Sequence, residues 1–177
     1  CEAQYEFMCD HRLPVQRYRG PLGVGLYFPR DAAMNPVRRA MGLAALYGGR
    51  ARLFERSPAV EIRPGTVVTP FGDISAETIV VAVDGRLEQL VPALDGRVRT
   101  ARLQMCCTAP LPAGLLPCPV YANFGYDYLQ QDDTGRVFAG GGRDRFTEAE
   151  WTDDAEPSED VQAWIDSLIG RVTGEVE

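Results

Sequence analysis

The stretch Thr78–Val83 constrains the fold more than any other part of the sequence. It reads Thr-Ile-Val-Val-Ala-Val and is followed directly by Asp84 and Gly85, a pair that favours a sharp turn. A short run with almost no polar side chain is typical of a β-strand that is buried on both faces. The chain is therefore expected to contain a sheet in which this strand is covered on both sides.

Two helices are predicted from their capping residues and apolar spacing. Asn35 is a good N-cap, Pro36 suits the first helical position, and the Gly pair at 48–49 ends the first helix. Ser158 begins the second helix, and acidic residues follow it in the first turn. Its apolar stripe consists of Val161, Trp164, Ile165, Leu168 and Ile169. A short helical stretch is also expected from residue 87 to 94.

Extended segments account for much of the remainder. Turn signals predict a small antiparallel meander over residues 59–74, and further strands are expected at Arg50–Ser57, Val120–Phe124, Tyr126–Gln131 and Arg136–Ala139. The first 20 residues show no clear period. This order of elements predicts an α+β fold with a mixed, largely antiparallel sheet and flanking helices.

The charge and composition of the chain exclude several classes of function. The 177 residues include 18 basic and 25 acidic side chains, giving a formal net charge of −7. Proteins that bind nucleic acid or membrane surfaces usually carry the opposite excess, so neither is expected as a partner. All basic residues are arginine, which excludes a mechanism based on a lysine. No apolar run reaches the roughly 18–20 residues of a membrane span, and no signal peptide is visible.

The cysteines and the single histidine do not indicate a metal site. The five cysteines have no Cys-x-x-Cys spacing, and His11 is the only histidine. We interpret the cysteines as buried, reduced thiols of a cytoplasmic protein. Cys106 and Cys107 are adjacent in an expected strand, so their side chains should point to opposite faces. A hydrolase that uses one of them is therefore disfavoured, and His11 is expected at the surface.

Two glycine-rich stretches and one acidic stretch have simple interpretations. Gly23–Gly25 contains a Gly-x-Gly pattern but lacks the third glycine and the helix of a dinucleotide-binding turn. Gly140–Gly142 is interpreted as a bend or bulge after a strand, although three glycines would also let the backbone approach a ligand. The acidic stretch from Glu148 to Asp160 is interpreted as a solvated surface.

A series of short motifs, in this order, resembles the D-amino-acid oxidase superfamily of flavoenzymes. The motifs lie at Ser57–Ile62, Val68–Gly72, Ala76–Gly85, Leu90–Leu94, Thr108–Pro112 and Tyr126–Gly141. The resemblance covers about residues 20–177 and is to enzymes of the gamma-glutamylputrescine, glycine and sarcosine oxidase type. It implies an FAD-dependent oxidoreductase that oxidises a small amine or amino acid at the carbon–nitrogen bond. The flavin would take a hydride equivalent from the substrate, and oxygen would reoxidise it.

The resemblance also implies roles for four residues. Val60 matches a position whose backbone contacts the adenine side of FAD, and Ala82 and Gly85 match a strand end that passes close to the cofactor. Small residues at such a position let the backbone approach a ligand. Tyr128 matches a tyrosine that faces the flavin ring and contacts the substrate, so it is the candidate catalytic residue. For each of these residues, ordinary packing remains the alternative.

The glycine-rich segments that hold FAD in this superfamily are missing. The chain begins at Cys1 and ends at residues 173–177 in an expected strand, so we expect an internal part of a longer enzyme. FAD is not expected to bind to this part alone. Residues 1–57 and 97–177 would belong to the substrate domain, and residues 58–96 would border the FAD domain. Self-association is expected, because the FAD domain would normally cover apolar surface. A binding module that has lost the flavin chemistry is the alternative.

Overall fold

The computed structural model describes residues 1–174, which divide into two compact units. The first unit contains residues 1–34, 103–147 and the chain from 156 onwards, and the second contains residues 35–102 and 148–155. This division by compactness does not test the predicted division into substrate and FAD-bordering parts, which stays a prediction.

The first unit is built on a four-stranded antiparallel sheet in the order β6-β9-β8-β7. Its strands are β6 (Met105–Cys107), β7 (Val120–Ala122), β8 (Asp127–Gln131) and β9 (Val137–Gly140). A turn of 3₁₀ helix at Asn123–Gly125 joins β7 to β8. The strand β8 therefore begins one residue later than predicted.

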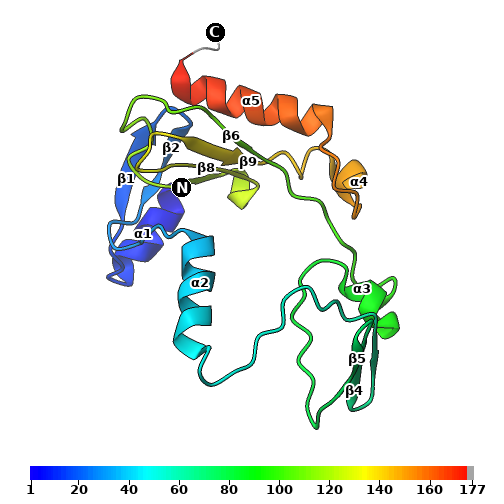
Figure 1. Cartoon of the computed structure of the whole chain (residues 1–177). Helices are drawn as coiled ribbons and strands as arrows, with labels where there is room; N and C mark the ends of the chain where they lie inside the picture. The colour runs from blue at the N-terminus through cyan, green and yellow to red at the C-terminus, as the bar shows by residue number, and fades with distance from the viewer. Residues whose placement is uncertain (175–177) are drawn as a thin grey trace. The chain divides into compact units, whose positions relative to one another are not determined.

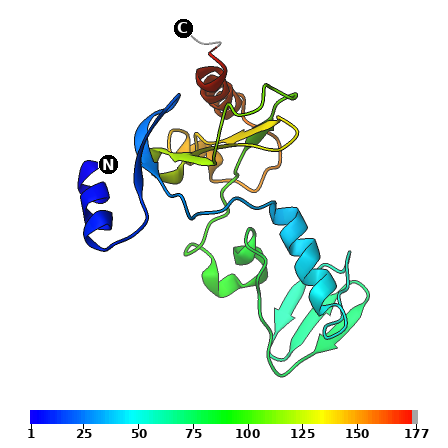
Figure 2. The same ribbon diagram turned by 90° about the vertical axis from the view of Figure 1, so that its left-hand side faces the viewer.

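Helix α5 (Glu159–Thr173) covers one face of this sheet and forms the core of the unit, as Figures 1 and 2 show. The side chains of Leu129 and Val137 point from the sheet towards the helix, and Ile165 and Leu168 point from the helix towards the sheet. All four side chains are at most 1% exposed. The predicted N-cap is confirmed, since the Ser158 hydroxyl accepts a hydrogen bond from the Val161 N–H. The apolar stripe read from the sequence is therefore the surface that packs on the sheet.

The first unit also contains helix α1 (Glu2–Asp10) and a hairpin of β1 (Gln16–Gly20) and β2 (Gly23–Tyr27). None of the α1 residues is buried. A helix without a buried face needs no regular apolar spacing, which explains why the sequence showed no period here. Gly23 and Gly25 lie in the edge strand β2, in agreement with the absence of a complete dinucleotide-binding turn.

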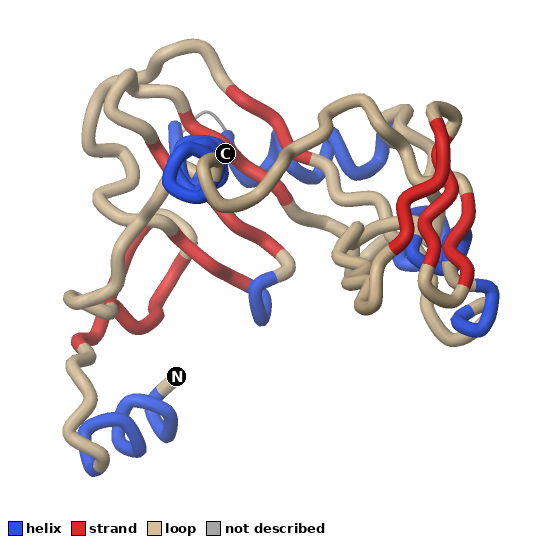
Figure 3. Tube along the Cα trace, turned by 60° about the horizontal axis from the view of Figure 1, so that its bottom comes forward, coloured by secondary structure: helices blue, strands red, loops and turns tan. Residues whose placement is uncertain are grey.

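The second unit contains helix α2 (Pro36–Tyr47), which is capped by the Asn35 side chain as predicted. The predicted meander is confirmed as an antiparallel sheet of β3 (Glu61–Arg63), β4 (Thr66–Thr69) and β5 (Gly72–Ser75), whose strands run side by side in Figure 3. Two short helical segments follow, α3 (Leu87–Leu90) and the 3₁₀ turn at Pro92–Leu94. Helix α4 (Thr147–Glu150) leads into the 148–155 segment of this unit.

Two predicted strands are wrong for the described chain. No strand forms at Thr78–Val83 or at Arg50–Ser57, and the Val80 side chain is 83% exposed. A strand needs a neighbour that accepts and donates its backbone hydrogen bonds. Within residues 1–174 no strand pairs with either segment, so apolar composition alone does not make them part of a sheet.

Three smaller expectations also change. Glu150 lies in the stretch interpreted as a solvated surface, but it is 1% exposed. The cysteines are unpaired as expected, although Cys1, Cys9 and Cys107 are exposed rather than buried. The strand expected over residues 173–177 is not formed at Thr173, which ends α5, and residues 175–177 lie outside the described chain.

Among the described helices, none has the length and apolarity needed to cross a bilayer. The predicted α+β fold class is confirmed.

Candidate functional site

The predicted catalytic residue Tyr128 lies on the face of the four-stranded sheet that α5 does not cover. Strand alternation turns its neighbours Asp127 and Leu129 towards α5, where both are buried. Tyr128 pairs with Tyr121 on β7 and with Gly140 on β9. The phenol ring is therefore presented from a central strand of a rigid sheet, a placement that holds a functional group more firmly than a loop does.

Gly140 provides the space in which the Tyr128 ring lies. A β-carbon at Gly140 would be about 2.5 Å from Cζ and the hydroxyl oxygen of Tyr128, far inside van der Waals contact. The next two glycines also leave room for side chains of this unit: Gly141 faces Asp127, and Gly142 faces Trp164. The three glycines thus allow close packing around the end of β9, and the left-handed φ of 80° at Gly142 fits the predicted bend.

The surroundings of Tyr128 keep its hydroxyl protonated. Partial burial raises the pKa of the phenol, and the neighbouring Tyr121 raises it further, whereas the positive charge of Arg143 acts in the opposite direction. The Tyr121 and Tyr128 rings are 6.3 Å apart between centroids and tilted by 38°. A protonated phenol donates one hydrogen bond, so Tyr128 is suited to binding an acceptor such as a carboxylate.

Arg143 was not identified from the sequence as a site residue. It follows the glycines at the end of β9, and its guanidinium carbon lies 5.6 Å from the centre of the Tyr126 ring. Tyr126 itself lies in the turn before β8 rather than in the strand, so strand alternation does not place it beside Tyr128 as expected. The signal available in the sequence was only the nearness of Arg143 to Gly140–Gly142.

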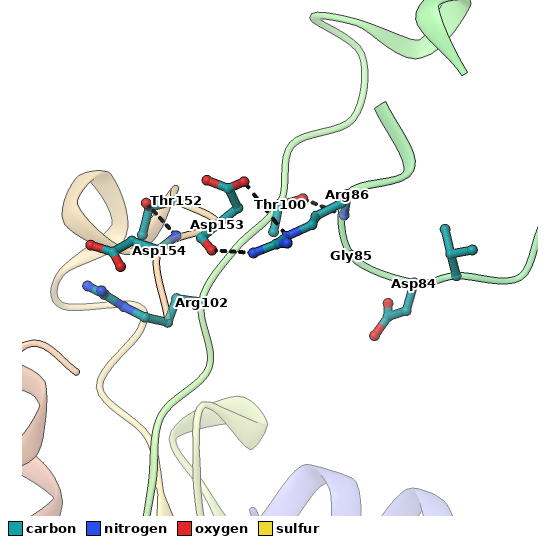
Figure 4. A pocket seen from close by; sticks show the side chains of 9 residues that line it. Asp84, Gly85, Arg86, Thr100, Arg102, Thr152, Asp153 and Asp154 are labelled. Carbon is teal, nitrogen blue, oxygen red and sulfur yellow. Dashed lines mark hydrogen bonds and ion pairs between the residues drawn. The ribbon is translucent and has the colours of Figure 1, made fainter. Parts of the chain in front are cut away.

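The second unit contains a cavity of about 270 Å³ that involves the predicted cofactor residue Gly85 (Figure 4). The cavity is lined by Val83, Asp84, Gly85, Arg86, Thr100, Arg102, Thr152, Asp153 and Asp154. The other predicted cofactor residues, Val60 and Ala82, do not line it. Val60 uses its N–H to bond the Val68 carbonyl at 2.9 Å, and Ala82 is exposed in the segment that forms no strand.

Hydrogen bonds hold the backbone around Gly85 in an uncommon conformation. Asp84 and Arg86 both have left-handed backbone angles, with φ of 60° and 64°. The Arg86 N–H donates to the Thr100 hydroxyl at 2.7 Å, and its guanidinium donates to the Asp153 carbonyl at 2.9 Å. Such strained residues persist where surrounding bonds hold them, and they are common at functional sites.

Glu88 fixes the opposite side of Thr100. Its carboxylate accepts hydrogen bonds from the Thr100 hydroxyl at 2.8 Å and from the Thr100 N–H at 3.3 Å. The pKa of Glu88 is lowered, first by its own backbone N–H and then by the Thr100 hydroxyl. The second carboxylate oxygen is buried and has no hydrogen-bond partner among the described residues. This carboxylate therefore adds negative charge beside the cavity.

The cavity does not fit the phosphates of FAD. Its lining includes Asp84, Asp153 and Asp154, whose negative charges would repel a pyrophosphate. The cations on the lining are engaged, since Arg86 bonds Asp153 and Arg102 forms a two-fold ion pair with the buried Glu150. The Arg86 N–H, the backbone donor beside Gly85, is used by Thr100. The lining of this cavity therefore does not suit the pyrophosphate of FAD.

The cysteines and His11 form no further site. Cys106 faces α5, where its thiol donates to the side-chain amide oxygen of Gln162 at 2.7 Å, whereas Cys107 is exposed on the other face, which confirms their opposite orientations. His11 is exposed, as expected, and its ring lies 4.1 Å from that of Phe7. Among residues 1–174, no group of three or more His, Cys, Asp or Glu residues is arranged to hold a metal ion.

Comparisons with known proteins give a consistent picture of the fold. The family model described as FAD dependent oxidoreductase matches residues 8–176. A crystal structure of glycine oxidase from Geobacillus kaustophilus is similar, with a TM-score of 0.69 and 20% sequence identity over 96% of this chain. The matched region is 49% of that glycine oxidase, so the present chain spans about half the length of this relative. Among curated proteins there is no significant match.

Proposed function

Because this chain belongs to the FAD dependent oxidoreductase family, we propose that it forms the substrate-binding part of an enzyme that oxidises an amine or an amino acid at the carbon–nitrogen bond. FAD is the cofactor of the complete enzyme in this proposal. Residues outside this chain would hold most of it, because the cavity beside Gly85 is unsuited to its phosphates. A cytoplasmic location stays a prediction.

The observation that carries the proposal is the sheet face with Tyr128. Helix α5 packs against one face of the sheet. The other face presents the Tyr128 phenol, whose ring occupies the space left free because Gly140 has no side chain. Orienting a substrate is the contribution that a protein makes when a cofactor supplies the chemistry. The likeness in fold to glycine oxidase supports the same assignment.

In this proposal Tyr128 binds and orients the substrate. Its ring rests against the Gly140 backbone and its hydroxyl donates a hydrogen bond to an acceptor of the substrate. The Tyr121 ring lies beside that of Tyr128 on the same face of the sheet. Val60 remains the candidate for a backbone contact with the adenine side of the cofactor, and Ala82 and Gly85 remain candidates for a close approach to it. Of these residues, Gly85 lines the cavity described above.

The proposal is tested on the complete enzyme that contains this chain. The purified enzyme should contain FAD, and its flavin absorbance should bleach without oxygen when the correct amine or amino acid is added. Tyr128→Phe should lower kcat/KM about 10- to 150-fold, because one hydrogen bond to a charged group contributes roughly 1.5–3 kcal/mol. The melting temperature should change little, since the ring is kept.

Tyr27→Phe is the matched control, because Tyr27 lies on the separate β1–β2 sheet. It should leave kcat/KM unchanged. An enzyme that contains FAD but is reduced by no amine or amino acid would contradict the proposed reaction. A chain that binds such compounds without FAD would instead be the binding module. If Tyr128→Phe leaves kcat/KM unchanged while lowering the melting temperature, Tyr128 is structural.

A further inference from the structure

Asp127, the residue before Tyr128, is a buried carboxylate on the side of the sheet that α5 covers. Its side chain is 3% exposed. Its Oδ1 atom accepts hydrogen bonds from two neutral donors, the Trp164 indole N–H of α5 at 2.9 Å and the Gly142 N–H at 3.2 Å. Removing a carboxylate from water is costly, and an apolar side chain would fill such a position at lower cost. The geometry that the two bonds impose therefore explains this carboxylate better than stability does.

The bond from Gly142 to Asp127 lies just beyond the end of the ladder between β8 and β9. The last pair of that ladder is Tyr128 with Gly140. Strand pairing with β8 therefore does not hold the backbone that follows Gly140. By accepting from the Gly142 N–H, the Asp127 side chain bonds this backbone to the start of β8. The end of β9 is thereby kept against β8 beside the Tyr128 ring.

Gly141 and Gly142 leave the space in which these contacts form. A β-carbon at Gly141 would overlap Oδ1 of Asp127, and one at Gly142 would lie 2.9 Å from Cδ1 of Trp164. Gly142 also has a left-handed φ of 80°, a conformation that favours glycine. The chain after β9 can therefore pass close to both side chains, and a larger residue at either position would separate them from it.

The Trp164 indole is a fixed donor for the Asp127 carboxylate. Its ring packs against the buried core between α5 and the sheet. The guanidinium carbon of Arg145 lies 3.7 Å from the centre of the same ring, within the range of a cation–π interaction. Because the indole is held by these contacts, its N–H restricts where the Asp127 carboxylate lies. The position of Gly142 is restricted in turn.

We propose that Asp127 is a positioning residue for the Tyr128 phenol and that Trp164 supplies the donor that fixes it. Through Gly142, the carboxylate keeps the end of β9, and with it Gly140, against the Tyr128 ring. Loss of either bond would let β9 move away from β8 at the Tyr128–Gly140 pair, and the phenol hydroxyl would lose its fixed direction. The effect on substrate oxidation rests on the proposed function, whereas the position of the ring does not.

Fluorine NMR of the complete enzyme labelled with fluorotyrosine tests the ring position without turnover. The resonance of Tyr128 is identified by its loss in Tyr128→Phe. Asp127→Ala and Trp164→Phe should each shift and broaden this resonance, because each variant removes a hydrogen bond while keeping Tyr128. Asp127→Asn should stay close to the wild type, since its side-chain amide oxygen can still accept both bonds.

Ile165→Val is the matched control for a general loss of packing. Ile165 is buried in the same core between α5 and the sheet, and its side chain has no polar atom to bond Asp127 or Gly142. This variant should leave the Tyr128 resonance in place. The positioning role would be overturned by a resonance that is unchanged in both Asp127→Ala and Trp164→Phe. It would also be overturned by a shift in Ile165→Val or Asp127→Asn as large as that in Asp127→Ala.

A double-mutant cycle in kcat/KM then shows whether the effect on turnover passes through the phenol. Trp164→Phe should lower kcat/KM for the oxidised amine or amino acid roughly 10- to 100-fold, because a small displacement of an orienting group is costly. In the Tyr128→Phe background the same change should have almost no further effect, because no hydroxyl remains to be positioned. Equal losses in both backgrounds would overturn the positioning role.

The two measurements separate this inference from the proposed function. If the Tyr128 resonance moves as expected but no amine or amino acid reduces the flavin, the positioning role stands and the proposed reaction is wrong. If an amine or amino acid is oxidised but the resonance stays in place in both Asp127→Ala and Trp164→Phe, the proposed reaction stands and the positioning role is wrong.

Discussion

At the scale of single residues, the orientation of the Tyr128 ring depends on the absence of a β-carbon at Gly140. The Gly140 α-carbon leaves open the volume that the phenol ring occupies, and its φ is not in the left-handed region. The glycine is therefore required for its small size rather than for an unusual backbone conformation. A substitution at Gly140 therefore tests the position of the Tyr128 ring without changing the tyrosine itself.

Gly140→Ala should displace the Tyr128 ring, because the new β-carbon would lie about 2.5 Å from it. Overpacking of this kind costs about 1–3 kcal/mol, which a urea denaturation series would detect. In the complete enzyme we expect kcat/KM to fall at least as far as in Tyr128→Phe. Gly25→Ala is the matched control, since a β-carbon there meets nothing within 4 Å. Full activity in Gly140→Ala would mean that the ring position is unimportant.

The sequence was informative about the face of β8 on which Tyr128 lies, but not about the residues of other segments that surround it. Alternation along β8 separates Tyr128 from Asp127 and Leu129, and this period is local, so it can be read directly. The pairing of Tyr128 with Gly140 depends on the register between two strands, and the approach of Arg143 depends on a turn. Glu150 was missed for the same reason, because its partner Arg102 is distant in sequence.

At the scale of elements, prediction succeeded where a segment contains its own partners. The helices α2 and α5 have caps and internal hydrogen bonds, and the β3–β4–β5 meander pairs through adjacent turns. Thr78–Val83 has no such local partner. Its composition suits a buried strand, but a strand is stabilised by its neighbours, so the same residues remain unpaired here.

The buried pair of Arg102 and Glu150 joins the 148–155 segment to the rest of the second unit. The guanidinium donates two bonds to the carboxylate, at 2.8 and 3.1 Å, and the Arg102 N–H donates to the Glu150 carbonyl. Arg102→Gln should lower the free energy of unfolding by about 3–5 kcal/mol, because it leaves a buried carboxylate without its cation. Replacing both residues, Arg102→Met with Glu150→Leu, should recover much of that loss.

Chemical denaturation measures both variants, with Arg63→Gln as the control. Arg63 pairs with Glu61 at the surface, where both side chains are about half exposed, so we expect no measurable change. Equal effects of Arg102→Gln and Arg63→Gln would show that burial of the Arg102 pair is unimportant.

The hairpin between β8 and β9 should be sensitive to acid. The Asp132 carboxylate accepts bonds from the Thr134 hydroxyl at 2.7 Å, the Thr134 N–H at 2.9 Å and the Arg136 N–H at 3.0 Å. These bonds, the Thr134 hydroxyl first, lower the pKa of Asp132 below its usual 3.8. The contribution to stability is therefore fully present above pH 3.8 and is lost as the pH falls through the lower pKa of the folded state.

Urea denaturation at a series of acidic pH values checks this expectation. Asp132→Asn removes the titration, so its stability should fall less steeply below about pH 4 than that of the wild type. Asp133→Asn, which changes a neighbour that accepts none of these three bonds, should follow the wild type. Parallel curves for wild type and Asp132→Asn would contradict the role of this carboxylate.

At the scale of the whole molecule, apolar side chains are exposed in both units. Phe124 and Tyr121 in the first unit are 102% and 76% exposed, and Val80 and Phe71 in the second are 83% and 78% exposed. Exposed apolar surface of this extent promotes association. We predict that the 177-residue chain alone forms dimers or larger species at concentrations on the order of tens of micromolar.

Sedimentation velocity tests the association. The double variant Val80→Ser with Phe71→Ser should shift the distribution towards the monomer, because it removes two of the most exposed apolar side chains. A wild-type chain that is monomeric throughout this concentration range would refute the prediction.

The position of α5 also decides how the nascent protein is protected during its synthesis. The strands β6 to β9 leave the ribosome before α5 does, so the sheet face with Leu129, Val137 and Ala139 waits for its helix. At a synthesis rate of about 5–20 residues per second this interval is a few seconds, much longer than hydrophobic collapse requires. A chaperone that binds apolar β-sheet surface would therefore meet this chain between the completion of β9 and that of α5.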